Sequence, residues 1–294
     1  MSTSYLNRLG AIDFSRTIER LAEGFTGREW LFTKLDHWLQ QEDGEKFYLL
    51  TGEPGVGKSA IAARLTQRWA HDKPEPGPLA AYHFCRAGDV ETVRPGRVLR
   101  SLATQLGRTL PHYGEALKEV LDQVHVRIDV NINIDRLSNS QVTGIYVENL
   151  KDLDPREEFR LLIQAPLTAL SKIYTTLGET PPALKVFLID SLDEAATTTG
   201  QENMVTLLAS LYQARETLPP WVRFLLTARP DRSVLNQFLP LQSQKIEELE
   251  AKNLSDIQRY VQGRIDEQLR EEPSTPEPQT SNAIVTNPKS LKQR

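Results

Sequence analysis

The stretch Gly52-Glu53-Pro54-Gly55-Val56-Gly57-Lys58-Ser59 decides the fold of this chain. It fits the phosphate-binding pattern G-x-x-x-x-G-K-[ST] at every fixed position. The residues before it, Phe47 to Thr51, are typical of a short buried strand, and the residues after it, Ala60 to Trp69, of a helix with an apolar stripe. The order strand, glycine loop, helix is the context in which this pattern binds the phosphates of a nucleotide.

Each residue type in this loop has a physical role in binding phosphate. Glycine lets the backbone curl so that successive N–H groups point inward, and the start of the helix adds the positive end of its dipole. Lys58 is predicted to reach the outer phosphates, and the Ser59 hydroxyl to hold Mg²⁺. The predicted nucleotide contacts are Gly52, Glu53, Pro54, Gly55, Val56, Gly57, Lys58, Ser59 and Ala60.

The composition narrows the class of protein. The chain has 294 residues and a formal charge of -4, which gives no sign of a nucleic-acid-binding surface. Its single cysteine, Cys85, excludes an internal disulfide framework and ends an apolar run, so we expect a buried thiol. No apolar segment approaches the roughly 20 residues that span a bilayer, and the first residues lack a signal-peptide core. The five histidines are not spaced as a zinc site, so Mg²⁺ is the metal expected. These features predict a cytoplasmic protein that does not contact membranes.

Strands that alternate with helices predict an α/β fold, in which a mostly parallel five-stranded sheet is flanked by helices. Beyond the first strand, apolar runs at 79–84, 184–189 and 222–226 are the next candidates, and 245–249 is a weaker fifth. Helical spacing of apolar residues covers 29–41, 98–110, 113–124 and 155–177, the last with a kink expected at Pro166.

A small β insertion and four sequence regions complete the predicted organisation. Strict alternation over 127–134 and a β-prone run at 143–147 indicate two half-exposed strands. The regions are an N-terminal lead (1–24), a P-loop domain (25–252), the start of a truncated helical domain (253–270) and a disordered, proline-rich tail (271–294).

A second polar segment follows the strand at 184–189. Asp190 comes directly after it, and Asp193 and Glu194 follow closely. Ligands of an open α/β sheet bind at the carboxyl ends of its strands. Asp190 is therefore the predicted Mg²⁺-side carboxylate, with Asp193 and Glu194 as candidates to orient the attacking water. The alternative is an acidic first turn that stabilises a helix.

The strand at 222–226 leads into Thr227-Ala228-Arg229-Pro230. Thr227 is a candidate to sense the γ-phosphate or the attacking water. Arg229 is a candidate to pair with phosphate charge. For Arg229 the alternative is a salt bridge to the nearby acids.

These motifs together resemble the NACHT family within the STAND class of signal-transducing P-loop ATPases. The resemblance rests on Phe25-Thr26-Gly27-Arg28-Glu29, the P-loop, Asp190-Ser191-Leu192-Asp193-Glu194 and Thr227-Ala228-Arg229-Pro230, in that order over about residues 25 to 270. It implies an ATP/ADP switch in which ADP holds a closed monomer and ATP permits self-association or assembly with other STAND-type subunits. It also implies that Phe25, Thr26 and Gly27 lie near the adenine and that Arg28 helps close the site.

Departures from the family pattern keep other functions open. An effector domain usually precedes the ATPase, and a winged helix follows with a nucleotide-contacting histidine for which no position here is a candidate. The leading hypothesis is an ATP-binding, slowly hydrolysing signalling module. The alternatives are an AAA+-like remodelling ATPase and a non-enzymatic adaptor that nucleotide only stabilises. A GTPase is less favoured, because the guanine-like motif Thr33-Lys34-Leu35-Asp36 precedes the P-loop and lies in an amphipathic helix. A small-molecule kinase is less favoured, because the acid cluster and the Thr-x-Arg-Pro strand end fit hydrolysis better.

Overall fold

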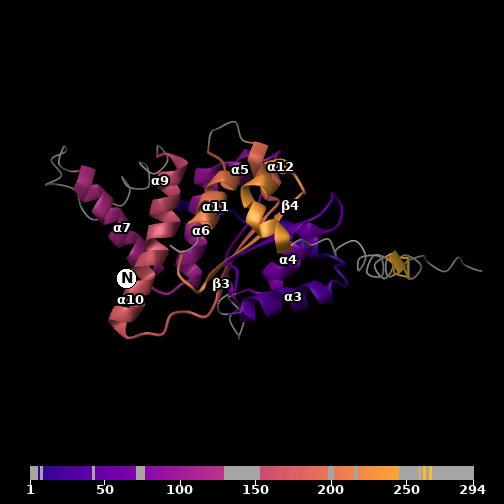
Figure 1. Ribbon diagram of the computed structural model, residues 1–294, viewed down its shortest axis with the longest axis horizontal. Helices are drawn as coiled ribbons and strands as arrows, with labels where there is room; N and C mark the ends of the chain where they lie inside the picture. The colour runs from indigo at the N-terminus through magenta and orange to yellow at the C-terminus, as the bar shows by residue number, and fades with distance from the viewer. Residues whose placement is uncertain are drawn as a thin grey trace, which may run out of the picture.

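The computed structural model describes residues 6, 9–41, 44–70, 77–128, 153–197, 202–214 and 218–244, with isolated helical positions at 258, 261–262 and 265–266. Strands and helices alternate along this part of the chain (Figure 1). The strands are β1 (Phe47–Thr51), β2 (Leu79–Phe84), β3 (Lys185–Asp190) and β4 (Val222–Ala228). The helices are α2 (Ser15–Ala22), α3 (Glu29–Gln40), α4 (Lys58–Arg68), α5 (Val90–Val93), α6 (Pro95–Thr109), α7 (Tyr113–Ile128), α9 (Pro155–Phe159), η2 (Arg160–Gln164), α10 (Ala165–Leu177), η3 (Leu192–Thr197), α11 (Met204–Gln213), α12 (Arg232–Leu235) and η5 (Asn236–Gln244).

The described strands form one all-parallel sheet in the order β1-β4-β3-β2. Parallel neighbours require crossover connections, which the helices supply. Because β4 lies between β1 and β3, the end of β4 separates the P-loop from the acidic segment. This order decides which side chains meet at the carboxyl edge.

Helices cover both faces of the sheet (Figure 1). One core cluster joins α3 and α4 to the sheet through residues such as Leu50, Leu188 and Leu225. The other cluster joins α6, α7, α10 and α11 to it through residues such as Phe187 and Phe224. Strands buried on both faces explain the almost unbroken apolar runs in the sequence.

Side chains of α6 complete the hydrogen bonding at the outer side of β2. The Gln105 amide donates to the Tyr82 carbonyl and accepts from the Tyr82 N–H, each at 2.9 Å. The Thr109 hydroxyl donates to the Ala80 carbonyl at 2.7 Å. These side chains occupy main-chain positions that a neighbouring strand would otherwise use.

The N-terminal region, predicted as a lead, packs on both faces of the sheet. Leu6 and Leu9 belong to the core on the α6 side, whereas Phe14 belongs to the core on the α4 side. The Ile12 N–H donates to the Ser101 hydroxyl at 2.9 Å between them. The chain therefore passes from one core to the other beside α6, and then forms α2, which packs on α4.

The fold agrees closely with the sequence expectation, with one correction and several untested segments. The four described strands are those predicted, and Cys85 is buried as expected. The predicted strand over 127–134 is wrong at its start, because Arg127 and Ile128 end helix α7. Extending an existing helix by one residue costs less free energy than starting a new element, so the helix continues where the polar/apolar alternation predicted a strand. Outside the described residues lie 129–134, 143–147 and the fifth strand at 245–249, as well as the tail from 271.

The helical run from Pro155 to Leu177 contains a π-helical segment, η2, just before Pro166. Proline has no N–H and its ring collides with the carbonyl four residues earlier, here that of Leu162. The buried Tyr113 hydroxyl donates a hydrogen bond to this Leu162 carbonyl. The kink expected at Pro166 thus takes the form of a local change in helix geometry, supported by a side chain of α7.

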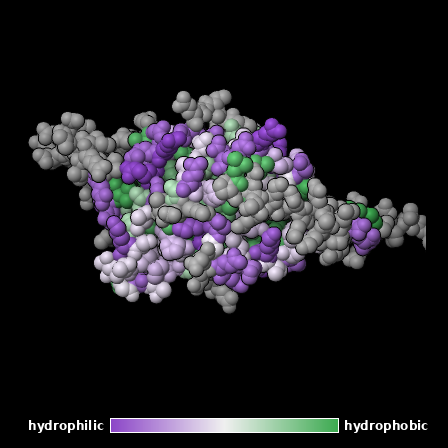
Figure 2. Space-filling view, viewed as in Figure 1, coloured by the Kyte–Doolittle hydropathy of each residue, from purple (hydrophilic) through white to green (hydrophobic). Residues whose placement is uncertain are grey.

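The face of the molecule in Figure 2 carries mostly hydrophilic and intermediate side chains, with hydrophobic residues in small groups. Among the described helices, none combines the length and apolar character needed to cross a bilayer.

Candidate functional site

The P-loop joins the end of β1 to the start of α4 with two glycines in left-handed conformations. Gly55 has φ 84° and Gly57 has φ 90°, values that side chains strongly disfavour. Gly57 is also the residue before the first turn of α4. The sequence thus places glycine where the backbone needs it, and the loop wraps around the N-terminus of α4.

Lys58 lies across this loop. Its Nζ donates to the carbonyls of Gly52 at 2.5 Å and Glu53 at 3.1 Å, and the residue is only 8% exposed. Burial lowers the pKa of Lys58, and the carboxylates of Asp193 and Asp190 act in the opposite direction. A buried ammonium at a loop of N–H groups and a helix start makes this edge of the sheet favourable for an anion.

Asp190 and Thr227 meet because their strands are neighbours in register. Ile189 pairs with Leu226, so the next residues, Asp190 and Thr227, lie side by side. The Thr227 hydroxyl donates to Asp190 Oδ1 at 2.6 Å.

Ser191 extends this network toward the P-loop. Its N–H donates to Thr227 Oγ1 at 2.9 Å, its hydroxyl donates to Asp190 Oδ2 at 3.1 Å, and its Oγ lies 3.4 Å from Ser59 Oγ. Burial raises the pKa of Asp190, while the hydrogen bonds from Thr227, Ser59 and Ser191 oppose that rise. The first helical turn of α4 is therefore linked to the ends of β3 and β4 through hydroxyl groups.

The two remaining acids are held by Arg229 and by the backbone of Ala87, which follows β2. Arg229 donates its N–H to Asp193 Oδ1 at 2.9 Å, and its guanidinium forms ion pairs with Asp193 at 3.3 Å and Glu194 at 3.4 Å. Glu194 Oε2 also accepts the Ala87 N–H at 2.8 Å. Arg229 thus forms the salt bridge that the sequence left open as an alternative to phosphate pairing.

The Phe25 to Arg28 segment reaches the P-loop through one side chain. Arg28 Nη2 donates to the Val56 carbonyl at 2.8 Å, and Arg28 is 8% exposed. Phe25 is partly buried and lies against Phe32 of α3, with 5.8 Å between ring centroids, whereas Thr26 is exposed.

The structure brings the predicted residues of the P-loop, β3 and β4 to one edge of the sheet, and adds two that the sequence argument did not single out. Ser191 has φ 56°, an uncommon conformation for a residue with a side chain, and it joins Asp190, Thr227 and Ser59. Ala87 contributes only its N–H. The position of Ser191 next to Asp190 is a sequence signal for its role, but a backbone donor such as Ala87 leaves no such signal.

The donors at this edge fit a magnesium ion bound with a nucleotide. Among the described residues, no group of three His, Cys, Asp or Glu side chains could hold a metal ion by itself. Mg²⁺ usually takes one or two protein ligands and completes its shell with phosphate oxygens and water. The buried carboxylate of Asp190 and the Ser59 hydroxyl supply that limited set.

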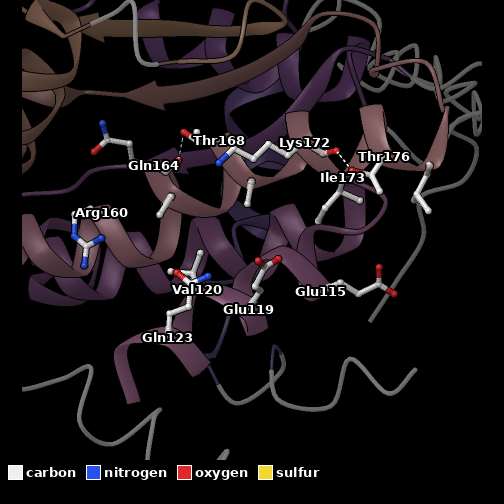
Figure 3. Close-up of a pocket in the computed structure, with 13 residues that line it drawn as sticks. Glu115, Glu119, Val120, Gln123, Arg160, Gln164, Thr168, Lys172, Ile173 and Thr176 are labelled. Carbon is white, nitrogen blue, oxygen red and sulfur yellow. Dashed lines mark hydrogen bonds between the residues drawn. The ribbon is translucent and has the colours of Figure 1, made fainter. Parts of the chain in front are cut away.

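A separate groove of about 760 Å³ lies between α7 and α10 (Figure 3). Charged side chains such as Glu119 and Lys172 flank an apolar base that includes Val120 and Ile173. None of the predicted site residues lines it. The groove therefore belongs to the helical layer rather than to the P-loop edge.

Comparison with known proteins gives one family and no individual relative. No curated protein and no solved structure matches the chain. One family model matches residues 26–151, a segment that contains the P-loop and Arg28 and ends before Asp190. Residues 26–151, less than half of the chain, are similar to the family described as Nephrocystin 3, N-terminal.

Proposed function

We propose that this chain is an ATP-binding module that hydrolyses ATP slowly and uses the bound nucleotide to control self-association. The observation that carries the proposal is the P-loop geometry, in which Gly55 and Gly57 adopt left-handed conformations and Lys58 lies buried across the loop. This is the arrangement that binds nucleotide phosphates. The resemblance of the motifs to NACHT proteins favours ATP and a switching role.

In this proposal, Lys58 turns from the loop carbonyls to the outer phosphates, and Ser59 and Asp190 hold Mg²⁺. The metal would neutralise phosphate charge when bound. Thr227 keeps Asp190 oriented through its 2.6 Å hydrogen bond. Phe25, Thr26 and Gly27 are proposed to lie near the base, on the evidence of the resemblance.

Slow turnover follows from the contacts of the two acids. Glu194 and Asp193 are the candidates to orient water, yet Arg229 forms an ion pair with each of them. While the guanidinium holds these carboxylates, their oxygens bond to Arg229 instead of orienting a water molecule. Arg229 must therefore leave the acids, for which the charge of the outer phosphate is a suitable competitor.

The binding test compares purified wild-type protein with Lys58→Ala by calorimetric titration of ATP and ADP, with and without Mg²⁺. We expect the variant to lose tight binding and remain folded, because Lys58 contacts loop carbonyls rather than the core. Lys34→Ala, at an exposed position of α3, is the matched control and should bind normally. Normal ATP affinity in Lys58→Ala would disprove the site assignment.

The hydrolysis test uses Glu194→Gln, with Glu119→Gln at an exposed position of α7 as control. The first variant should bind ATP and release phosphate more slowly, whereas the control should match wild type. Unaltered turnover in Glu194→Gln would move the water-orienting role to Asp193 or away from this segment. A wild-type protein that binds ATP without turning it over would favour the adaptor function. Sedimentation with ATP and with ADP then tests self-association.

A further inference from the structure

We infer that Arg28 is a positioning residue that orients a phosphate-binding N–H group of the P-loop, rather than a residue that reads the base. The inference rests on the proposed nucleotide site and deepens it. Its evidence is the 2.8 Å hydrogen bond from Arg28 Nη2 to the carbonyl of Val56.

Because the peptide bond is rigid, the hydrogen bond to the Val56 carbonyl also fixes the direction of the N–H group on the same peptide. The peptide between Val56 and Gly57 is planar and trans, so its C=O and N–H point in opposite directions. Holding the Val56 carbonyl on the Arg28 side makes the Gly57 N–H face the other side of the loop. A phosphate cradle needs such an N–H pointing at the ligand.

Gly57 needs this external support because of its own freedom. Its φ of 90° lies in a region that glycine enters without strain but also leaves easily. A Cβ added at Gly57 would lie 3.9 Å from Arg28 Nη2, so the guanidinium is next to this residue. A fixed hydrogen bond to the preceding carbonyl removes part of that freedom before a ligand arrives, which improves binding by preorganisation.

Arg28 is itself held firmly enough to do this. Its backbone is left-handed with φ 68°, which is uncommon for a residue with a side chain, and its carbonyl accepts the N–H groups of Leu31 at 2.9 Å and Phe32 at 3.2 Å. Those bonds begin α3. The guanidinium is therefore delivered from the rigid start of a helix, and the position before α3 acts on the phosphate loop.

The test measures the affinity of wild type, Arg28→Met and Arg28→Lys for two ligands, ATP and inorganic tripolyphosphate, by calorimetry. Methionine keeps much of the volume but has no donor, whereas lysine can still donate to the Val56 carbonyl. We expect Arg28→Met to bind both ligands about tenfold more weakly, by the same factor, and Arg28→Lys to recover most of the affinity. Arg64→Met, at an exposed position of α4, controls for the loss of one arginine charge and should bind both ligands as wild type.

Three other outcomes would overturn the inference. Unchanged tripolyphosphate affinity in Arg28→Met, with weaker ATP binding, would mean that Arg28 acts on the base. Wild-type affinity of Arg28→Met for both ligands would mean that the side chain only packs. A loss of affinity in Arg28→Lys as large as in Arg28→Met would exclude the hydrogen bond as the cause. If the methionine variant does not fold, the affinity of Arg28→Lys for the two ligands decides. If wild type binds neither ligand, the proposed function fails instead, and this result is separate from the others.

Discussion

The carboxyl edge of the sheet and the helical layer beside it each bury a carboxylate, with opposite solutions for its charge. Asp190 is 2% exposed and accepts hydrogen bonds from hydroxyl groups, and within the described residues no cation forms an ion pair with it. Glu158 of α9 is 3% exposed and forms a 2.6 Å ion pair with Arg100 of α6. Hydroxyls can rearrange around an incoming cation, whereas the partly buried Arg100 carries a charge that is always present. The difference separates a carboxylate suited to a ligand from one that holds two helices together.

The surroundings of Glu158 are built around its carboxylate. A Cβ at Gly96 would lie 2.3 Å from Glu158 Oε2, so any larger residue at that point of α6 would force the Glu158 carboxylate to move. Burial raises the pKa of Glu158 to about 7, although the charge and the hydrogen bond of Arg100 act against the rise. If the comparison is right, changes here alter stability and leave nucleotide binding intact, and changes at Asp190 do the reverse.

The largest effect is expected from Glu158→Ala, which leaves the partly buried charge of Arg100 without its partner. We expect a loss of about 4 kcal/mol in the free energy of unfolding, measured with urea. The double variant Glu158→Met with Arg100→Met should be much less destabilised, since no charge is left uncompensated. A single variant as stable as the double would show that this ion pair is not what joins α6 to α9.

The next effect is the contribution of Glu158 to the pH dependence of the free energy of unfolding. Its pKa is about 7 in the folded protein, above the ordinary value of 4.5, so the folded state binds the proton more tightly. The contribution to stability is therefore fully present below about pH 4.5 and is lost as pH rises to about 7, by roughly 3 kcal/mol. Urea unfolding of wild type and Glu158→Gln across this range gives the difference that isolates the group. A difference that stays constant with pH would contradict the raised pKa.

A smaller effect, on binding instead of stability, is expected at the sheet edge. Asp190→Asn should weaken ATP binding in the presence of Mg²⁺ by about 30-fold, equivalent to about 2 kcal/mol. The free energy of unfolding without nucleotide should change by less than about 1 kcal/mol, because asparagine can accept the Thr227 hydrogen bond without burying a charge. Equal losses of stability at Asp190 and Glu158 would remove the distinction between the two regions.

The smallest effect tests how the helical layer supplies its own hydrogen-bond partners. Tyr113→Phe removes the donor to the Leu162 carbonyl and should cost about 1 kcal/mol of stability. In a Pro166→Ala background the cost should be smaller, because the restored N–H can donate to the same carbonyl. Urea unfolding of the two single variants and the double variant measures this coupling. Additive losses would mean that Tyr113 does not substitute for the missing N–H at Pro166.

The sequence predicts the strands and the P-loop well because both depend on local signals. Apolar runs mark β1 to β4, and glycine at positions 55 and 57 marks the two left-handed residues. The strand order is not local, and it is what places Thr227 beside Asp190.

Other features depended on contacts that a single sequence does not encode. Ala87 binds Glu194 only through its backbone, and the hydrogen bond of Arg28 depends on the turn before α3. The sequence did not predict helix α2, because this helix is short and is stabilised by packing on α4.

The hydrogen bonds from Gln105 of α6 to β2 affect how copies of this chain can associate. A sheet that ends in an unsatisfied strand invites another chain to extend it, which is a common route to uncontrolled association. Gln105 and Thr109 already bond to the main chain of Tyr82 and Ala80, so a foreign strand would have to displace α6 to add itself there. Growth of the sheet by strand addition is thus blocked on the β2 side, and association of this domain on that side has to use side-chain surfaces.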